Sequence, residues 1–179
     1  VPRIIEKIRF SGTSGPVSLP FTPVLDIRNA LTLAAWIKPT SILTPGGGFA
    51  SVISGRPFSY QYGVAPDRRI GFGFPSGAGG VRSIVASNTA VALDRFTFVV
   101  ATFDSSSGIS RIYIDGVMDA QASFFGTIDS STRDFQIGGF AGPDLSVGYG
   151  AFTGSIDEPQ IFNRALTANE VAAIYAAGS

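Results

Sequence analysis

The last thirty residues constrain the fold most, because a strand-like segment runs directly into a short, well-signalled helix. Thr167 opens the sequence Thr-Ala-Asn-Glu, in which its hydroxyl can accept a hydrogen bond from the backbone N–H of Glu170 while the Glu170 side chain reaches back. Gly178 is placed to end this helix in a left-handed conformation. Apolar residues fall on one helix face: Val171, Ile174 and Tyr175. The pattern predicts a closing helix packed onto a sheet.

The rest of the chain reads as short strands joined by turns. Its 22 glycines and 11 prolines are spread through 179 residues, which favours many turns over one disordered tract. The run from Leu31 alternates along a strand expected to end at Pro39. Asp115 and Gly116 predict a type I′ hairpin, because both positions of that turn need positive φ. With 45% hydrophobic residues, the length predicts one domain over residues 1–179.

Composition excludes several function classes. The sequence has no histidine and no cysteine, so a Ser-His-Asp triad and the usual zinc sites are absent. The formal net charge is zero and the arginines are scattered, which argues against nucleic acid as a partner. No run approaches the roughly 18 apolar residues that a membrane helix needs, so we expect no membrane insertion. No signal peptide is visible at the N-terminus, since its first residues alternate and carry charges.

Four segments, in order, resemble laminin-G-like domains of the concanavalin A-like lectin and glucanase group. They are LTLAAWIKPT, FVVATFDSSSGISRIYIDGV, FQIGGF and FTGSIDEPQIFNRAL. The resemblance implies an all-β, two-sheet antiparallel jelly-roll sandwich with one short C-terminal helix. One departure is the segment from Arg95 to Phe98, where many relatives carry a Trp-His-His-type sequence. Phenylalanine also fills an apolar strand position, so we expect the fold to tolerate this change.

Catalysis is not expected. Glucanases of this group carry two carboxylates on one strand face in the pattern Glu-x-Asp-x-Glu, which this chain lacks. Its only glutamates are Glu6, Glu158 and Glu170, and the last is better explained as a helix cap. Asp157 and Glu158 are adjacent and would point to opposite strand faces, so they cannot flank one glycosidic bond. We expect Glu158 to be a surface residue or a partner of Arg164. A glycan-active enzyme with dispersed carboxylates remains the weaker alternative.

The resemblance implies a role for Asp157. In that family an aspartate of the final strand often joins backbone carbonyls to hold a structural Ca²⁺, which takes oxygen ligands. The carbonyls are expected near Gly12 or Gly55. The competing interpretation is that Asp157 accepts backbone hydrogen bonds across the sheet and holds no ion. Both interpretations stay open at this stage.

Glycan recognition would need exposed aromatic rings and polar groups, usually on loops at one end of a sandwich. The aromatic candidates are Tyr60, Tyr62, Phe72, Phe74, Phe124, Phe125, Phe140 and Tyr149. Most of them should pack inward, as aromatic residues on alternating strands usually do. The best candidates are Tyr60 with Tyr62, two residues apart, and Tyr149 in a glycine-rich loop, because a phenol keeps a solvent-facing end. The serines before Gly108 read as a turn.

The predicted function is therefore a non-catalytic binding or adhesion module. We expect it to recognise glycans or a protein surface at a cell or particle exterior, with an extracellular or virion-surface location. The alternative is structural decoration or assembly, for example of a phage virion, without a small ligand. Low charge makes a homo-oligomer or larger assembly plausible.

Overall fold

The structure, a computed structural model, describes residues 7–13, 15–42, 49–55, 59–76, 81–130, 134–139 and 150–178. Within these residues the chain forms two six-stranded antiparallel sheets. Sheet A, in spatial order, contains β1 (Ile8–Ser11), β12 (Thr153–Phe162), β3 (Ala30–Ser41), β8 (Thr97–Asp104), β9 (Ile109–Ile114) and β10 (Val117–Ser123). Sheet B contains β2 (Val17–Leu19), β11 (Phe135–Ile137), β4 (Ala50–Gly55), β5 (Tyr60–Val64), β6 (Arg69–Ser76) and β7 (Val81–Ala90).

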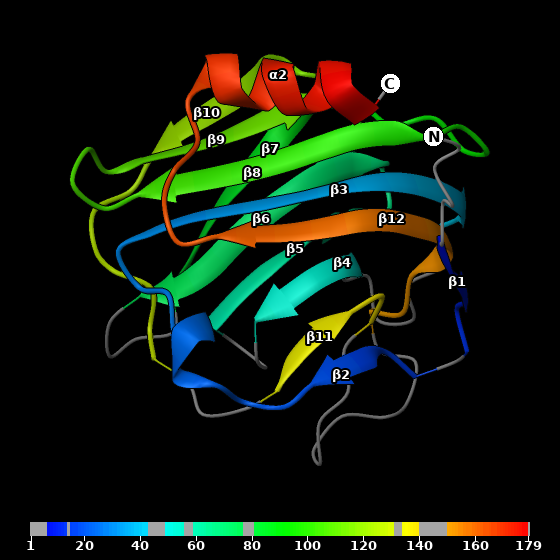
Figure 1. Cartoon of the computed structure of the whole chain (residues 1–179), viewed down its shortest axis with the longest axis horizontal. Helices are drawn as coiled ribbons and strands as arrows, with labels where there is room; N and C mark the ends of the chain where they lie inside the picture. The colour runs from blue at the N-terminus through cyan, green and yellow to red at the C-terminus, as the bar shows by residue number, and fades with distance from the viewer. Residues whose placement is uncertain are drawn as a thin grey trace.

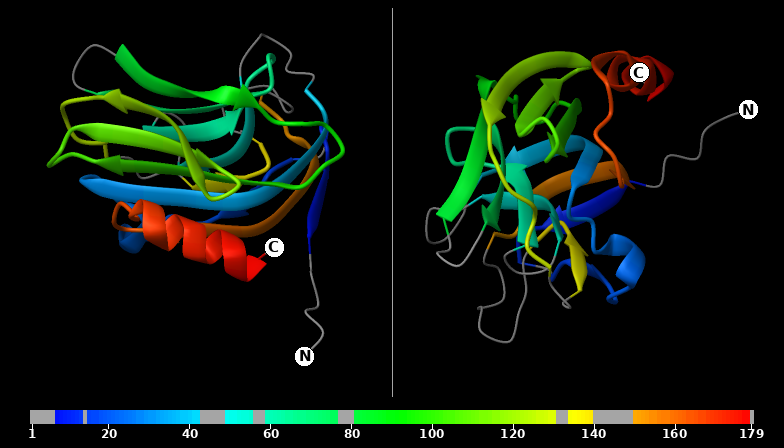
Figure 2. Two further views of the ribbon diagram at one scale, coloured as in Figure 1. Left: turned by 90° about the horizontal axis from the view of Figure 1, so that it is seen from above. Right: turned by 90° about the vertical axis from the view of Figure 1, so that its left-hand side faces the viewer.

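The sheets stack face to face, and the helix α2 (Ala168–Gly178) lies across the outer face of sheet A (Figures 1 and 2). A short 3₁₀ turn, η1 (Pro23–Leu25), connects β2 to the segment before β3. This arrangement confirms the predicted all-β jelly-roll sandwich with one short C-terminal helix. No helix among the described residues is long and apolar enough to cross a membrane.

β3 shows how the sequence pattern builds both apolar layers. Leu31, Leu33 and Ile37 are fully buried between the sheets, as their alternation predicts. Trp36 points to the opposite face, where its ring lies 5.2 Å from that of Phe98. The α2 residue Tyr175 stacks on Trp36 at 5.6 Å. A strand covered on both sides in this way needs apolar residues at consecutive positions, which explains the run of leucine, alanine and tryptophan in β3.

Two local predictions concerned turns and strand ends. The hairpin is confirmed: Asp115 and Gly116 have φ values of 48° and 82°, and they connect β9 to β10. The expected end of β3 at Pro39 is wrong, because the strand continues to Ser41. Proline is tolerated there because the pairing of β3 with β8 has already ended at Ile37, so no ladder bond on that side requires a Pro39 N–H.

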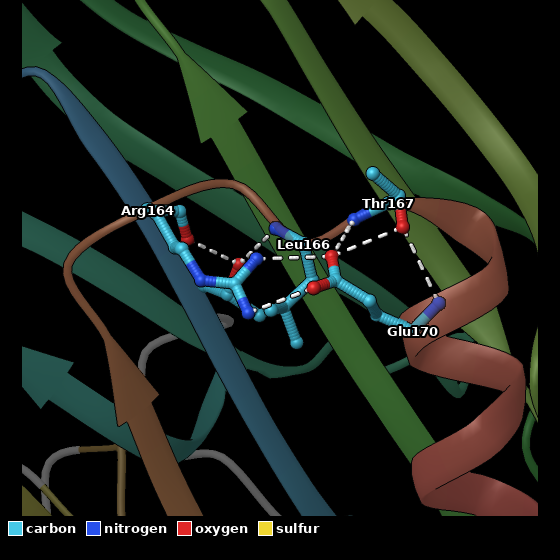
Figure 3. A network of polar contacts seen from close by, with 5 residues as sticks. Arg164, Leu166, Thr167 and Glu170 are labelled. Atoms are coloured by element: carbon cyan, nitrogen blue, oxygen red, sulfur yellow. Dashed lines mark hydrogen bonds and ion pairs between the residues drawn. The ribbon is translucent and has the colours of Figure 1, made fainter.

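The start of α2 confirms the predicted capping box (Figure 3). The backbone N–H of Thr167 donates to Glu170 Oε2 at 2.8 Å, and the Glu170 N–H donates to Thr167 Oγ1 at 3.3 Å. Arg164 binds both carboxylate oxygens of Glu170, at 2.8 and 2.9 Å. Arg164 therefore pairs with the helix cap and not, as one expectation had it, with Glu158.

The predicted left-handed end at Gly178 is wrong, because this residue lies in the last helical turn without a positive φ. Glycine is required at this position for a different reason, which is the close approach of α2 to Trp36. A Cβ on Gly178 would come 2.8 Å from Trp36 Nε1, so only glycine lets the helix end approach the indole this closely.

Candidate functional site

The two tyrosines predicted to bind a ligand lie in the core. Tyr60 is 3% exposed and Tyr62 is 0% exposed, and both belong to the cluster between the sheets. The expectation that each phenol keeps a solvent-facing end is thus wrong, because alternation along β5 turns both side chains inward. Burial raises the pKa of the Tyr62 phenol, whose oxygen has no hydrogen-bond partner among the described residues. In this arrangement neither ring offers a surface to a ligand. Tyr149, the third predicted residue, and Phe140 lie outside the described residues.

Asp157 lies on β12 opposite Trp36, and its Oδ1 accepts a hydrogen bond from the backbone N–H of Glu158 at 2.9 Å. Gly12 packs against Thr153, four residues away along β12, which is about 13 Å of extended strand. Gly55 belongs to sheet B and pairs with Phe135 and Tyr60. Neither glycine is therefore paired with Asp157, although β1 itself lies beside β12 up to the pairing of Ile8 with Ile156.

Among the described residues, no three histidine, cysteine, aspartate or glutamate side chains form a group that could hold a metal ion. The site that the resemblance implied uses one carboxylate together with backbone carbonyls, so the calcium role of Asp157 stays a prediction. The hydrogen bond from Glu158 matches the competing interpretation only in part, because it is local and does not cross the sheet.

An apolar cavity of about 220 Å³ opens between the sheets beside β2 and β12. Its walls include Leu19, Leu25, Phe135 and Pro159, and all of its lining side chains are apolar. Sugar hydroxyls would lose their hydrogen bonds to water in such a cavity and gain none, which is unfavourable. This cavity is therefore unsuited to binding a sugar.

Three segments meet at one end of the sandwich, and we call them the loop end: residues 26–29, 104–108 and 124–130. They gather at the left side of Figure 1, which faces the viewer in the right-hand view of Figure 2. The Ser105 N–H donates to the Asn29 carbonyl at 2.8 Å, and the Phe124 N–H donates to the Gly108 carbonyl at 2.6 Å. The Ile128 N–H donates to the Arg28 carbonyl at 2.9 Å. These backbone bonds join segments that are far apart in the sequence.

Phe125 is the most exposed large apolar side chain among the described residues, with 84% of its surface accessible. It follows directly after Phe124, whose ring points inward and lies 4.8 Å from the Phe74 ring. The Phe125 ring borders Gly108, where an added Cβ would come 3.1 Å from its Cδ1. Gly108 has a φ of 65°, so the turn itself also favours glycine. The outcome is an aromatic face held in solvent beside a serine-rich turn.

Polar groups lie on the turn that leads to Gly108. Asp104 Oδ1 accepts from the Ser106 N–H at 2.9 Å and from the Ser106 hydroxyl at 2.7 Å. These hydrogen bonds lower the pKa of the Asp104 carboxyl below its ordinary value, so it stays ionised in mildly acidic solution. The Ser107 hydroxyl donates to the Asp104 carbonyl at 3.3 Å. An ionised carboxylate accepts hydrogen bonds well but cannot serve as the protonated acid that glycoside cleavage needs.

The sequence offered both Phe124 and Phe125 as candidate sugar-binding rings and favoured inward packing for each, which is right for Phe124 and wrong for Phe125. One signal could have separated the two, since adjacent residues of an extended segment point to opposite sides and only one can enter the core. The serines at 105–107, expected to form only a turn, do so by hydrogen bonding to Asp104 just before Gly108, which the Phe125 ring borders.

Comparison with known proteins supports the architecture. The model of the concanavalin A-like lectin/glucanases superfamily matches residues 11–172. Comparison with curated protein sequences gives no match.

Solved structures resemble the chain over nearly its whole length. The CBM40 domain of the Ruminococcus gnavus IT-sialidase, bound to α2,3-sialyllactose, has a TM-score of 0.76 and 16% identity, and the match covers 95% of this chain and 96% of that one. A heptameric SAP-like pentraxin from Limulus polyphemus has a TM-score of 0.67 and 18% identity, with 94% and 81% covered. A Bacteroides ovatus protein described as a suggested carbohydrate-binding protein has a TM-score of 0.74 and 18% identity. The match covers 96% of this chain and 47% of that one. At these identities the likeness establishes the fold.

Proposed function

Because the chain belongs to the concanavalin A-like lectin/glucanases superfamily, matched over residues 11–172, we propose that it is a non-catalytic module that binds glycans through its loop end. The observation that carries this proposal is the 84% exposure of Phe125 beside the serine-rich turn. A flat apolar ring removes the C–H face of a sugar from water, while neighbouring hydroxyl and carboxylate groups bond its hydroxyls. The similar structures named for carbohydrate binding support the same choice.

The backbone bonds on either side of Phe125 also support binding. Phe124 anchors the segment in the core, and the backbone bonds to Gly108 and Arg28 fix it on both sides. A backbone that is already ordered before the ligand arrives loses less conformational entropy on binding, which favours affinity. We place this module at a cell or particle exterior, where glycans are displayed.

The test is a glycan array followed by titration calorimetry on the parent and on Phe125→Ala. We expect the parent to bind at least one glycan and Phe125→Ala to lose roughly fivefold or more in affinity, since stacking on an aromatic ring is worth about 1 kcal/mol or more. Val117→Ala is the matched control, because Val117 is 70% exposed on β10, outside the loop end. Binding that survives in Phe125→Ala, or a parent that binds no glycan, contradicts the proposal. Release of new sugar ends from any bound glycan would favour the enzymatic alternative.

A structural role in an assembly has one observation in its favour. β2, η1 and the segment between them expose a run of apolar side chains: Val17, Leu19, Phe21 and Val24. Such patches often mark protein contacts. Light scattering at increasing concentration tests this alternative, with Val24→Ser as the variant: self-association that the substitution removes would support it.

A further inference from the structure

We infer that the apolar cavity beside β2 and β12 binds the unbranched alkyl chain of a small molecule. A chain of about six to eight carbons fits, because a cavity of about 150 Å³ with similar walls holds benzene and this one measures about 220 Å³. None of the lining residues belongs to the loop end. The inference therefore goes beyond the proposed glycan function and does not depend on it.

The cavity takes walls from both sheets (Figure 1). Ile53 of β4 and Phe135 and Ile137 of β11 line it from sheet B, and none of the three is more than 7% exposed. Pro159 and Ile161 of β12 line it from sheet A. These strands are paired with their neighbours in each sheet, so the walls are formed without a ligand.

An irregular stretch of β12 lies beside the cavity. The pairing of β12 with β3 shifts register between Asp157 and Gln160, and Glu158 takes a φ of 46°. Pro159 lies within this stretch and lines the cavity. A bulge bends its strand and increases the local twist, which gives a physical reason for a gap between the sheets at this point.

Leu19 marks the mouth of the cavity. It is one of the lining residues, and 43% of its surface is exposed to solvent. It also belongs to the exposed apolar run that extends from Val17 to Val24. An amphiphile can place its alkyl chain behind Leu19 and leave its polar end in water, where that end keeps its hydrogen bonds.

The chemistry of the walls selects a hydrocarbon. A buried water needs about two to four polar partners, and no polar side chain of a described residue lines the cavity. An alkyl chain needs no such partner, and it restores the dispersion contacts that an empty cavity lacks. Among the described lining residues only Phe135 could stack on an aromatic ligand, which favours an alkyl chain over a ring.

The experiment titrates the full chain with linear alcohols from butanol to decanol and follows carbon-13-labelled isoleucine methyl groups by NMR. Ile53, Ile137 and Ile161 report on the cavity, and Ile112, which is buried in the core without lining it, is the internal control. We expect the three cavity methyl signals to shift and that of Ile112 to stay. Affinity should rise about fourfold for each added methylene group. The rise should end at about eight carbons, where the cavity is full.

A matched ligand and matched variants sharpen this test. Octane-1,8-diol has the length of octanol but carries a hydroxyl at its buried end, so it should bind roughly tenfold more weakly. Ile161→Phe adds volume at a partly buried wall position and should weaken octanol binding several-fold. Val24→Ser is the control, because Val24 is 76% exposed and does not line the cavity. If Ile161→Phe does not fold, Leu19→Gln at the exposed mouth should weaken octanol binding instead.

The outcomes separate this inference from the glycan function. Cavity methyl signals that shift with no alcohol overturn the inference, and the glycan function then stands or falls with Phe125→Ala. Equal shifts at Ile112, or an octanediol that binds as tightly as octanol, indicate non-specific adsorption and overturn it as well. A parent that binds octanol as expected and binds no glycan overturns the glycan function alone.

Discussion

Thr32 and Thr102 are paired across β3 and β8, and only the Thr32 hydroxyl is hydrogen bonded. Both side chains are buried, at 0% and 1% exposure. Thr32 Oγ1 donates to the Arg164 carbonyl at 2.7 Å and accepts from the Leu166 N–H at 2.9 Å. Thr32 therefore fastens the segment before α2 onto sheet A. Thr102 Oγ1 has no hydrogen-bond partner among the described residues.

Replacing each threonine by valine should have opposite effects. Thr32→Val keeps the volume but leaves two backbone groups without their partner, so we expect the free energy of unfolding to fall by about 2 kcal/mol. Thr102→Val removes a buried hydroxyl that makes no bond, and stability should stay equal or rise by about 1 kcal/mol. Urea unfolding of both variants measures these changes. Equal losses in the two variants would contradict the assigned role of Thr32.

The sequence pattern predicted the structural features that depend on residues close together in the chain. The alternation at Leu31 and Leu33 fixes which face of β3 enters the core, and the Thr167 to Glu170 spacing fixes where α2 begins. These features depend on periodicity and on groups within one turn of each other, so they need no knowledge of the rest of the chain.

Features that depend on distant segments were not predicted. The role of Gly178 follows from the approach of α2 to Trp36, which is more than a hundred positions away in the sequence. The burial of Tyr62 depends on which face of β5 sheet A covers, and the exposure of Phe125 depends on three loops that meet only in the folded protein. The residue type alone, tyrosine or phenylalanine, does not predict whether either side chain is buried or exposed.

The Glu170 carboxylate should make the start of α2 sensitive to acid. The ion pair with Arg164, followed by the hydrogen bonds from Thr167, lowers the pKa of Glu170 to about 2. The folded value lies below the ordinary one, so this contribution to stability is complete above about pH 4.5 and is lost as the pH falls toward 2. We therefore expect the stability difference between the parent and Glu170→Gln to shrink over that range.

Trp36 gives a convenient measurement of this effect, because it is the only tryptophan and Tyr175 of α2 stacks on it. Denaturant unfolding followed by its fluorescence at pH 6, 4 and 2.5 yields the difference at each pH. A difference that stays constant from pH 6 to pH 2.5 would show that the Glu170 charge does not stabilise the helix.

The β9–β10 hairpin should not tolerate a side chain at Gly116. Its φ of 82° disfavours other residues, and a Cβ there would come 2.9 Å from Tyr175 Cδ1 on α2. We expect Gly116→Ala to lower the free energy of unfolding by about 1–3 kcal/mol. Gly15→Ala is the matched control, because an added Cβ there meets nothing within 4 Å, and its effect should stay within about 0.5 kcal/mol. Similar losses in both variants would mean that the turn geometry is not the cause.

Asp157 should stabilise the fold through its own strand and not through calcium. Its Oδ1 accepts from the Glu158 N–H where β12 bulges and Glu158 takes a φ of 46°, so the carboxylate supports a local backbone distortion. We expect Asp157→Ala to lower the melting temperature by the same amount in millimolar Ca²⁺ and in chelator, while the parent does not respond to Ca²⁺. An ion bound only by the folded state would raise the melting temperature of the parent by mass action. If Ca²⁺ raises it in the parent and not in Asp157→Ala, then Asp157 is a calcium ligand and its partner carbonyls lie elsewhere than at Gly12 and Gly55.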